Sequence, residues 1–200
     1  MQLKKIFLTR LPIVLCCMIS MSCSNERIKP AGLYNIDSLI VTQIDYLIAH
    51  KATMRKETTL NGIEKISTTI PKNAMDWKNE LAIFSELDVI NKPINKGAYT
   101  IENHADIKSN LQVQAFNTTA DLPVKYLRVY YQHSLNKIRK IEAQYNEANT
   151  LYTSARFLAM EFEDSFDKTI LTSYSIKGGQ KMFLDDTVRY TIDVSINLKN

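Results

Sequence analysis

The residues best suited to chemistry in this chain are few, and their spacing argues against most catalytic sites. The three histidines are His50, His104 and His133, and none has a partner at the spacing that places two metal ligands on one helix face. The sequence contains no H-E-x-x-H motif and no EF-hand loop. Its five glycines form neither a phosphate-binding loop nor a G-x-S-x-G nucleophile elbow. The motifs therefore predict no catalytic residue, no metal site and no cofactor.

One acidic segment, EFEDSFD at residues 161–167, places four carboxylates within seven residues. Paired carboxylates can cleave a glycosidic bond or bind Ca²⁺. One hypothesis is therefore a hydrolase that uses these acids, Glu161, Glu163, Asp164 and Asp167. The same composition is typical of a solvated strand end and turn, with Phe162 and Phe166 facing the core, and we favour this second interpretation.

The strongest binding signal is a stretch in which cations alternate with tyrosines between residues 124 and 140. Cations and phenols on a sheet face can hold an anionic glycan, a lipid head group or the acidic surface of an envelope protein. The alternative is ordinary strand alternation, with half-buried tyrosines covered by Lys and Arg stems. The candidate binding residues are Lys125, Tyr126, Arg128, Tyr130, Lys137, Arg139 and Lys140.

All three cysteines of the chain lie within its first 23 residues. Three basic residues precede an apolar run at residues 11–19, which is too short to cross a bilayer as a helix of about 20 residues. Small side chains at Ser20 and Ser22 then flank Met21, directly before Cys23. A charged start, a short apolar core and a small-residue exit are typical of a secretory signal peptide.

Residues 20–23, Ser-Met-Ser-Cys, resemble the lipobox of bacterial lipoproteins. The resemblance implies that residues 1–22 are removed and that Cys23 receives a diacylglycerol and becomes the mature N-terminus. Two or more acyl chains anchor a protein stably, so the expected location is the cell envelope, with the membrane bound through the N-terminal lipid and the outer membrane favoured. Cleavage at the same bond without lipidation is the alternative.

Removal of this leader changes both the charge and the cysteine content. The chain has 25 basic and 21 acidic residues, and residues 1–22 hold three of the basic residues and none of the acidic ones, which leaves a net charge of +1. Cys16 and Cys17 leave with the leader, so that the folded part has no thiol for a disulfide, a metal or nucleophilic catalysis. The small net charge removes the main support for nucleic-acid binding.

Two segments of the remaining chain have helical periodicity. Residues 33–50 carry apolar side chains every three to four positions, with Asn35 or Asp37 as the N-terminal cap. Residues 73–93 have Asn73 as a candidate cap, Pro93 as a stop signal and an apolar stripe of Trp77, Leu81, Phe84 and Leu87. Between the two segments, Asn61-Gly62 predicts a hairpin, which we expect to be peripheral because both of its faces are polar.

From residue 99 onward the pattern is typical of strands. Residues 188–198 alternate apolar and polar side chains, which predicts an antiparallel sheet with one buried and one wet face. Residues 169–184 predict a hairpin that turns at Gly178-Gly179, and Asp185-Asp186 a turn into the last strand. Further strands are expected at residues 124–133 and 137–145. Residues 150–163 fit a helix or a strand, and the strand is favoured.

These elements predict an α+β fold, with two N-terminal amphipathic helices and a small β-hairpin packed on an antiparallel β-meander. The expected organisation is a signal peptide at 1–22, a lipidated N-terminus and tether at 23–32, and one domain at 33–200. The favoured function is a non-catalytic binding or assembly module held at a membrane. The alternatives are a carrier of a small apolar ligand or lipid in a cup-shaped sheet and, third, the carboxylate hydrolase.

Overall fold

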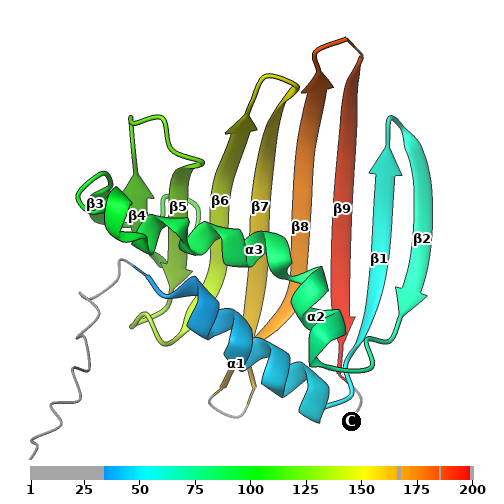
Figure 1. Cartoon of the computed structure of the whole chain (residues 1–200). Coiled ribbons are helices and arrows are strands. Elements are labelled where there is room, and N and C mark those ends of the chain that lie inside the picture. Colours follow the sequence, from blue (N-terminus) through cyan, green and yellow to red (C-terminus); the bar gives the residue numbers. More distant parts are fainter. Residues whose placement is uncertain (1–33, 166–167, 185, 199–200) are drawn as a thin grey trace, which may run out of the picture. The chain divides into compact units, whose positions relative to one another are not determined.

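The computed structural model describes residues 34–165, 168–184 and 186–198. One antiparallel sheet of nine strands has the order β2-β1-β9-β8-β7-β6-β5-β4-β3, and the helices lie across one of its faces (Figure 1). The predicted α+β class is confirmed at this level. The strands are β1 (Thr53–Leu60), β2 (Ile63–Thr69), β3 (Thr100–Ala105), β4 (Gln112–Asn117), β5 (Val124–Tyr131), β6 (Ile138–Ala148), β7 (Tyr152–Ser165), β8 (Lys168–Met182) and β9 (Thr187–Asn197).

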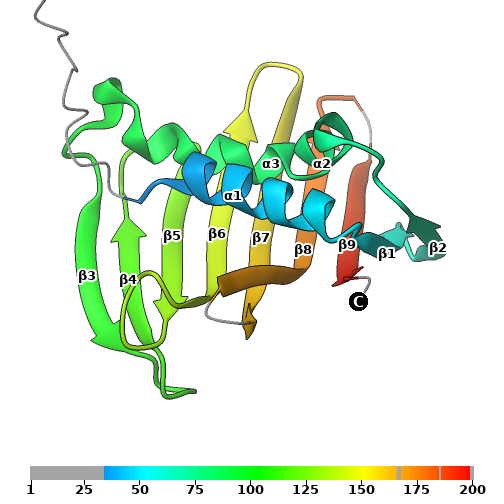
Figure 2. The same cartoon turned by 90° about the horizontal axis from the view of Figure 1, so that it is seen from below.

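The helical layer contains two main segments that run side by side across strands β5 to β9 (Figure 2). Within the described residues, no helix is long and apolar enough to span a bilayer. The segments comprise α1 (Ile36–Ala49), α2 (Ala74–Glu80), α3 (Ala82–Ser85) and the 3₁₀ turns η1 (Glu86–Asn91) and η2 (Pro93–Asn95).

Helix α1 forms where its periodicity predicts it. The Asn35 side-chain oxygen accepts a hydrogen bond from the Ser38 amide at 2.8 Å, so Asn35 provides the side-chain cap. Gln43 fixes the helix to the sheet: its amide nitrogen donates to the Thr169 carbonyl at 3.0 Å, and its amide oxygen accepts from the Leu171 amide at 2.7 Å. This buried side chain thus satisfies both backbone groups at the start of β8.

The second predicted helix is broken into α2, α3 and η1. Its cap and stripe are confirmed: Asn73 accepts from the Asp76 amide at 3.0 Å, and all four stripe residues are fully buried. From Leu81 onward the apolar side chains recur every three residues, and a 3₁₀ segment of three residues per turn keeps such side chains on one face. Pro93 opens η2 instead of ending the helical region.

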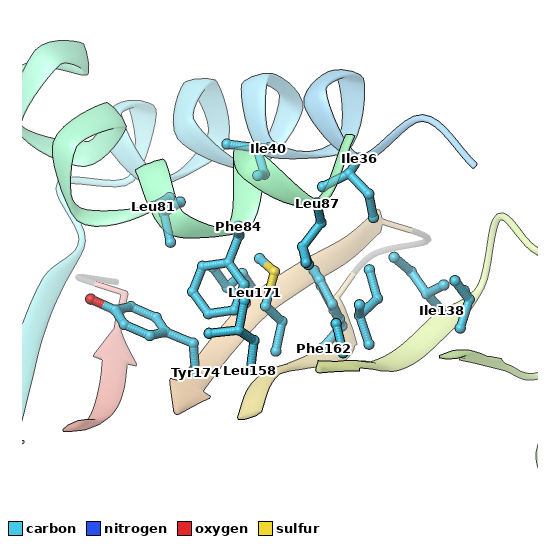
Figure 3. Packing of buried hydrophobic residues seen from close by; sticks show 14 of the residues in the cluster. Ile36, Ile40, Leu81, Phe84, Leu87, Ile138, Leu158, Phe162, Leu171 and Tyr174 are labelled. Carbon is cyan, nitrogen blue, oxygen red and sulfur yellow. The ribbon is translucent and has the colours of Figure 1, made fainter. Parts of the chain in front are cut away.

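The core lies between these helices and the middle of the sheet (Figure 3). Phe84 points from α3 toward the sheet and meets Tyr174 edge-on, with 5.5 Å between ring centroids. The Tyr174 hydroxyl donates to Glu80 at 2.9 Å, and Lys56 donates to the same carboxylate oxygen at 2.6 Å. Burial and then the charge of Glu80 raise the pKa of Tyr174, so the phenol stays protonated and can donate. These contacts tie α2 to β1 and β8.

The Asn61-Gly62 hairpin is confirmed at the edge of the sheet. Both residues have positive φ, 48° and 87°, and β2 has no second neighbour in the sheet. The strands expected at residues 124–133, 137–145 and 150–163 are also confirmed, as β5, β6 and β7.

The hairpin predicted at Gly178-Gly179 is wrong, because β8 runs straight through both glycines and the chain turns after Met182. Neither glycine has a positive φ. A Cβ atom at Gly178 would lie 2.8 Å from the Tyr190 hydroxyl oxygen, so this glycine makes room for the Tyr190 ring. The two glycines lie within a continuous strand, where Gly178 lets a side chain of the neighbouring strand come close to its backbone, and they do not reverse the chain.

The alternation predicted for residues 188–198 is only half correct. Val194 and Ile196 are buried, but Val188 is 38% exposed and Tyr190 is half-buried. The helices cross only one end of the long strands, and β1, β2, β8 and β9 continue beyond them (Figure 1). At that end, apolar side chains on the helix-facing side of the sheet therefore have no helix above them.

Candidate functional site

The predicted binding residues on β5 and β6 are only partly brought together. Tyr126, Arg128, Tyr130 and Lys140 lie on the face of the sheet opposite the helices, since their neighbours Leu127, Val129 and Ile141 belong to the core. We call this face the bare face; on β7, β8 and β9 it carries Phe157, Lys177 and Thr191. Register shifts next to Lys125 and Arg139 leave these two residues outside the regular pairing.

Most of these cations are held in ion pairs. Nitrogen–oxygen distances are 3.1 Å for Lys125–Asp121, 2.7 Å for Arg139–Asp164, 3.9 Å for Lys137–Asp164 and 2.7 Å for Lys140–Glu142. The Arg128 guanidinium lies 4.4 Å from the centroid of the Tyr126 ring. The predicted binding role of the set stays a prediction, but its charges already have partners within the domain.

A hydrogen-bonded carboxylate lies at the centre of this set. Tyr130 donates to Glu142 at 2.8 Å; burial, and then this hydrogen bond, raise the pKa of Tyr130 to about 12. Burial alone would raise the pKa of Glu142, but hydrogen bonds from Lys140 and Tyr130 outweigh burial and lower it. Beneath the set, Val113 and Ala115 of β4 are buried. The arrangement is typical of a satisfied polar network on a sheet face.

Two acids of the acidic segment, Asp164 and Glu161, have hydrogen-bond partners among the described residues. Asp164 accepts hydrogen bonds from Arg139 and Thr169, and the Arg139 hydrogen bond is the main cause of its lowered pKa. Glu161 accepts from Ser173 at 3.2 Å, and Asp167 lies outside the described residues. An acid held ionised cannot supply the proton that glycoside cleavage needs. Within the described ranges, no three His, Cys, Asp or Glu side chains come close enough to hold a metal.

The bare face is hollowed near one end of β7, β8 and β9, in a groove of about 650 Å³. Strand register explains the hollow. One row across the strands contains Thr191, Lys177 and Phe157, and another contains Thr187, Lys181 and Thr153. The row between them contains Arg189, Gly179 and Ala155. Since glycine has no side chain and alanine only a methyl group, the middle row forms a low floor between two higher rows.

Three exposed cations surround this floor: Lys177, Lys181 and Arg189. None of them makes an ion pair with any residue that the structure describes. Phe157, which is 51% exposed, pairs in register with Lys177. Hydroxyl groups complete the lining, from Thr59, Thr153, Thr187 and Thr191. The groove can therefore hold an anionic group, with a ring or alkyl segment against Phe157.

A second groove, of about 720 Å³, runs along the outer side of α1. Its lining includes Tyr46, whose ring stacks on His50 at 3.9 Å between centroids and lies 5.7 Å from the Lys168 ammonium. This groove is slightly larger, but among the described residues that line it Lys168 is the one Lys or Arg. The groove on the bare face has three, and we take it as the stronger candidate.

The two glycines of the groove are expected to respond differently to a methyl group. A Cβ atom at Gly178 would lie 2.8–2.9 Å from the Tyr190 ring atoms and 3.0 Å from the Ala155 carbonyl oxygen, whereas at Gly179 the nearest atom is 3.7 Å away. We expect Gly178→Ala to lower the free energy of unfolding by about 1–3 kcal/mol and Gly179→Ala to leave it unchanged or raise it by up to about 1 kcal/mol. Urea denaturation of both variants tests this, and equal stabilities would contradict it.

The three groove cations were missed by the sequence reasoning, although a signal was present. In K-G-G-Q-K, at residues 177–181, the two lysines are four positions apart and share one face of a continuous strand. The interpretation of the glycines as a turn separated them. Arg189 joins them only through the pairing of β8 with β9.

Comparisons with protein-family models, with curated proteins and with solved structures found no match in any of the three. The candidate site is therefore argued from its own geometry. Its defining features are the low floor at Gly179, the three cations without ion pairs among the described residues and the exposed ring of Phe157.

Proposed function

We propose that this chain is a non-catalytic binding module, held at a cell-envelope membrane by a lipid on Cys23, and that the groove on its bare face binds an anionic ligand. The observation that carries the binding proposal is the placement of Lys177, Lys181 and Arg189 around one hollow without ion pairs to described residues. The anchoring proposal depends on the lipobox-like residues 20–23 and on the lack of cysteine after residue 23.

The chemistry of the groove favours a phosphate or carboxylate carried on a larger molecule. Ammonium and guanidinium groups form their strongest hydrogen bonds with such oxyanions. The exposed Phe157 ring adds a flat apolar surface beside Lys177, which suits a sugar ring or an alkyl chain. An acidic glycan and an anionic lipid head group share this chemistry.

The alternative functions have less structural support. A carrier with a cup-shaped sheet needs a closed sheet around a cavity, whereas this sheet is open, with β2 and β3 as its two edges. A carboxylate hydrolase needs a proton donor, whereas Asp164 is paired with Arg139 at 2.7 Å. An assembly role through the same bare face remains compatible with the groove, because acidic protein surfaces present similar carboxylates.

Binding is tested with the full chain in neutral detergent micelles. The chain is titrated with a soluble polyuronate and, separately, with micelles that contain phosphatidylglycerol. We expect saturable binding of at least one probe, weakened as the salt concentration rises, and no binding of neutral dextran or phosphatidylcholine micelles. The two anionic probes distinguish a glycan from a lipid head group. Failure of both to bind at low salt would contradict the proposal.

Anchoring is tested by the intact mass of the chain recovered from bacterial membranes. We expect residues 1–22 to be absent and Cys23 to carry the mass of a diacylglycerol. A Cys23→Ala variant should not be acylated, because the thiol that accepts the lipid is gone. An unmodified Cys23, or a chain that keeps residues 1–22, would contradict the anchoring proposal and leave the groove proposal standing.

A further inference from the structure

Three hairpin tips lie side by side at the end of the sheet that the helices leave uncovered (Figure 1). The strands β2-β1-β9-β8-β7-β6 are consecutive neighbours, so the β1–β2, β8–β9 and β6–β7 connections fall at the same end. Hydrogen bonds join the tips: the Asn61 amide donates to the Arg189 carbonyl, and the Phe183 amide to the Leu151 carbonyl, both at 2.9 Å. The tips thus form one connected edge.

This edge carries a group of exposed apolar side chains, which we call the tip cluster. Leu184 is 90% exposed, Phe183 78% and Leu151 66%. Single exposed apolar residues are ordinary on protein surfaces, but several gathered at one end indicate a contact surface. The tip cluster consists of Leu60, Ile63, Leu151, Met182, Phe183, Leu184 and Val188.

Cations lie directly behind the tip cluster. Lys181 precedes Met182 on β8, and Arg189 follows Val188 on β9; both belong to the bare face. Lys65 of β2 is exposed beside Ile63 on the third hairpin, and the acids Glu64 and Asp186 are exposed at the same tips. An apolar edge backed by Lys and Arg matches the boundary of a bilayer, where acyl chains lie beneath anionic phosphates and long basic side chains extend to the head groups.

We propose that the tip cluster inserts into the surface of a bilayer that contains anionic lipid. Phe183, Leu184 and Leu151 would enter the acyl region, while Lys181 and Arg189 would lie among the head groups. The edge is formed by turns that project beyond the sheet, and a stable protein–protein interface needs about 800 Å² on each partner. A fluid bilayer can surround such projecting side chains without a matching surface. This inference goes beyond the groove, because insertion needs neither a bound glycan nor a lipid on Cys23.

The test uses a single cysteine carrying a fluorophore that reports the polarity of its surroundings. No cysteine occurs after residue 23, so Leu184→Cys gives a single labelling site once Cys16, Cys17 and Cys23 are replaced by serine, with the same chain lacking Leu184→Cys as the labelling background. After reconstitution into vesicles of phosphatidylglycerol and phosphatidylcholine, we expect blue-shifted emission that is quenched by lipids brominated on their acyl chains. The matched control is Ile107→Cys, which is fully exposed in the β3–β4 loop at the other end of the sheet and should keep aqueous emission.

The second comparison introduces negative charges into the tip cluster. A label at Leu151→Cys should report insertion in the native background and return to aqueous emission when Phe183→Asp and Leu184→Asp are added. Aqueous emission from position 184 in vesicles would overturn the inference, and so would a blue shift that grows with protein concentration without lipid, which would indicate a second copy. Insertion that Lys177→Gln leaves unchanged, in a chain that binds no soluble polyuronate, would contradict the groove proposal alone, and polyuronate binding without insertion would contradict this inference alone.

Discussion

Replacement of Phe84 by alanine is expected to lower the free energy of unfolding by about 3–5 kcal/mol. Phe84 is fully buried and meets Tyr174 edge-on across the interface between helices and sheet. Removal of the ring loses buried apolar surface and leaves a cavity that its neighbours, Leu81 and Leu87 among them, can fill only in part. Chemical denaturation followed by circular dichroism measures the change.

Met75→Ala is the matched control for this prediction. Met75 lies in the same helical segment but is 61% exposed, so its truncation should change the free energy of unfolding by less than about 0.5 kcal/mol. If Phe84→Ala and Met75→Ala lowered the free energy of unfolding equally, the helices would not pack on the sheet as described. The face opposite the helices could then not be identified as the bare face.

Removal of the groove cations is expected to weaken ligand binding by about 100-fold or more. Hydrogen bonds to charged groups contribute about 1.5–3 kcal/mol each, and about 1.4 kcal/mol corresponds to a factor of ten in affinity. The variant carries Lys177→Gln, Lys181→Gln and Arg189→Gln. These side chains are exposed and make no ion pair with described residues, so the fold should be unaffected.

The control for this loss of affinity removes three positive charges from the surface of residues 125–140, which the sequence predicted as the binding site. Lys125→Gln, Lys137→Gln and Lys140→Gln lower the net charge equally but act on lysines that pair with Asp121, Asp164 and Glu142. We expect this variant to keep affinity within a fewfold of the native chain. Equal losses in both variants would indicate general attraction by net charge and would contradict a defined groove.

The sequence predicted elements well where one local rule determines the backbone. Asn61-Gly62 turns the chain because both residues have the positive φ that a tight hairpin requires. Asn35 and Asn73 begin helices because their side chains satisfy free amides. In these places the cause and the effect lie within four residues of each other.

The sequence misled where the deciding contact is distant along the chain. Gly178 looks like a turn residue, and only the Tyr190 ring on the neighbouring strand shows that it provides space. The alternation at residues 188–198 is regular, but the pattern does not state how far the helices reach across the sheet. Val194 is buried because it lies beneath the helices, and Val188 is exposed because it lies beyond them.

The candidate site shows the same division. The sequence indicated a sheet face with cations and tyrosines at residues 125–140, and part of that set does lie on the bare face, but the groove lies on other strands of the same face. It could not tell which cations pair with acids, because Arg139 meets Asp164 from 25 positions away. It also could not bring Arg189 next to Gly179 without the register of β8 and β9.

The most direct test of the groove is a map of backbone amide chemical shifts in the full chain, recorded by NMR as the bound anionic probe is added. We expect the largest changes at residues 177–181 and 187–191, with Phe157 and Thr153 among the next. Changes centred on residues 125–140, with the groove amides unmoved, would contradict this expectation and return the binding role to the surface of β5 and β6.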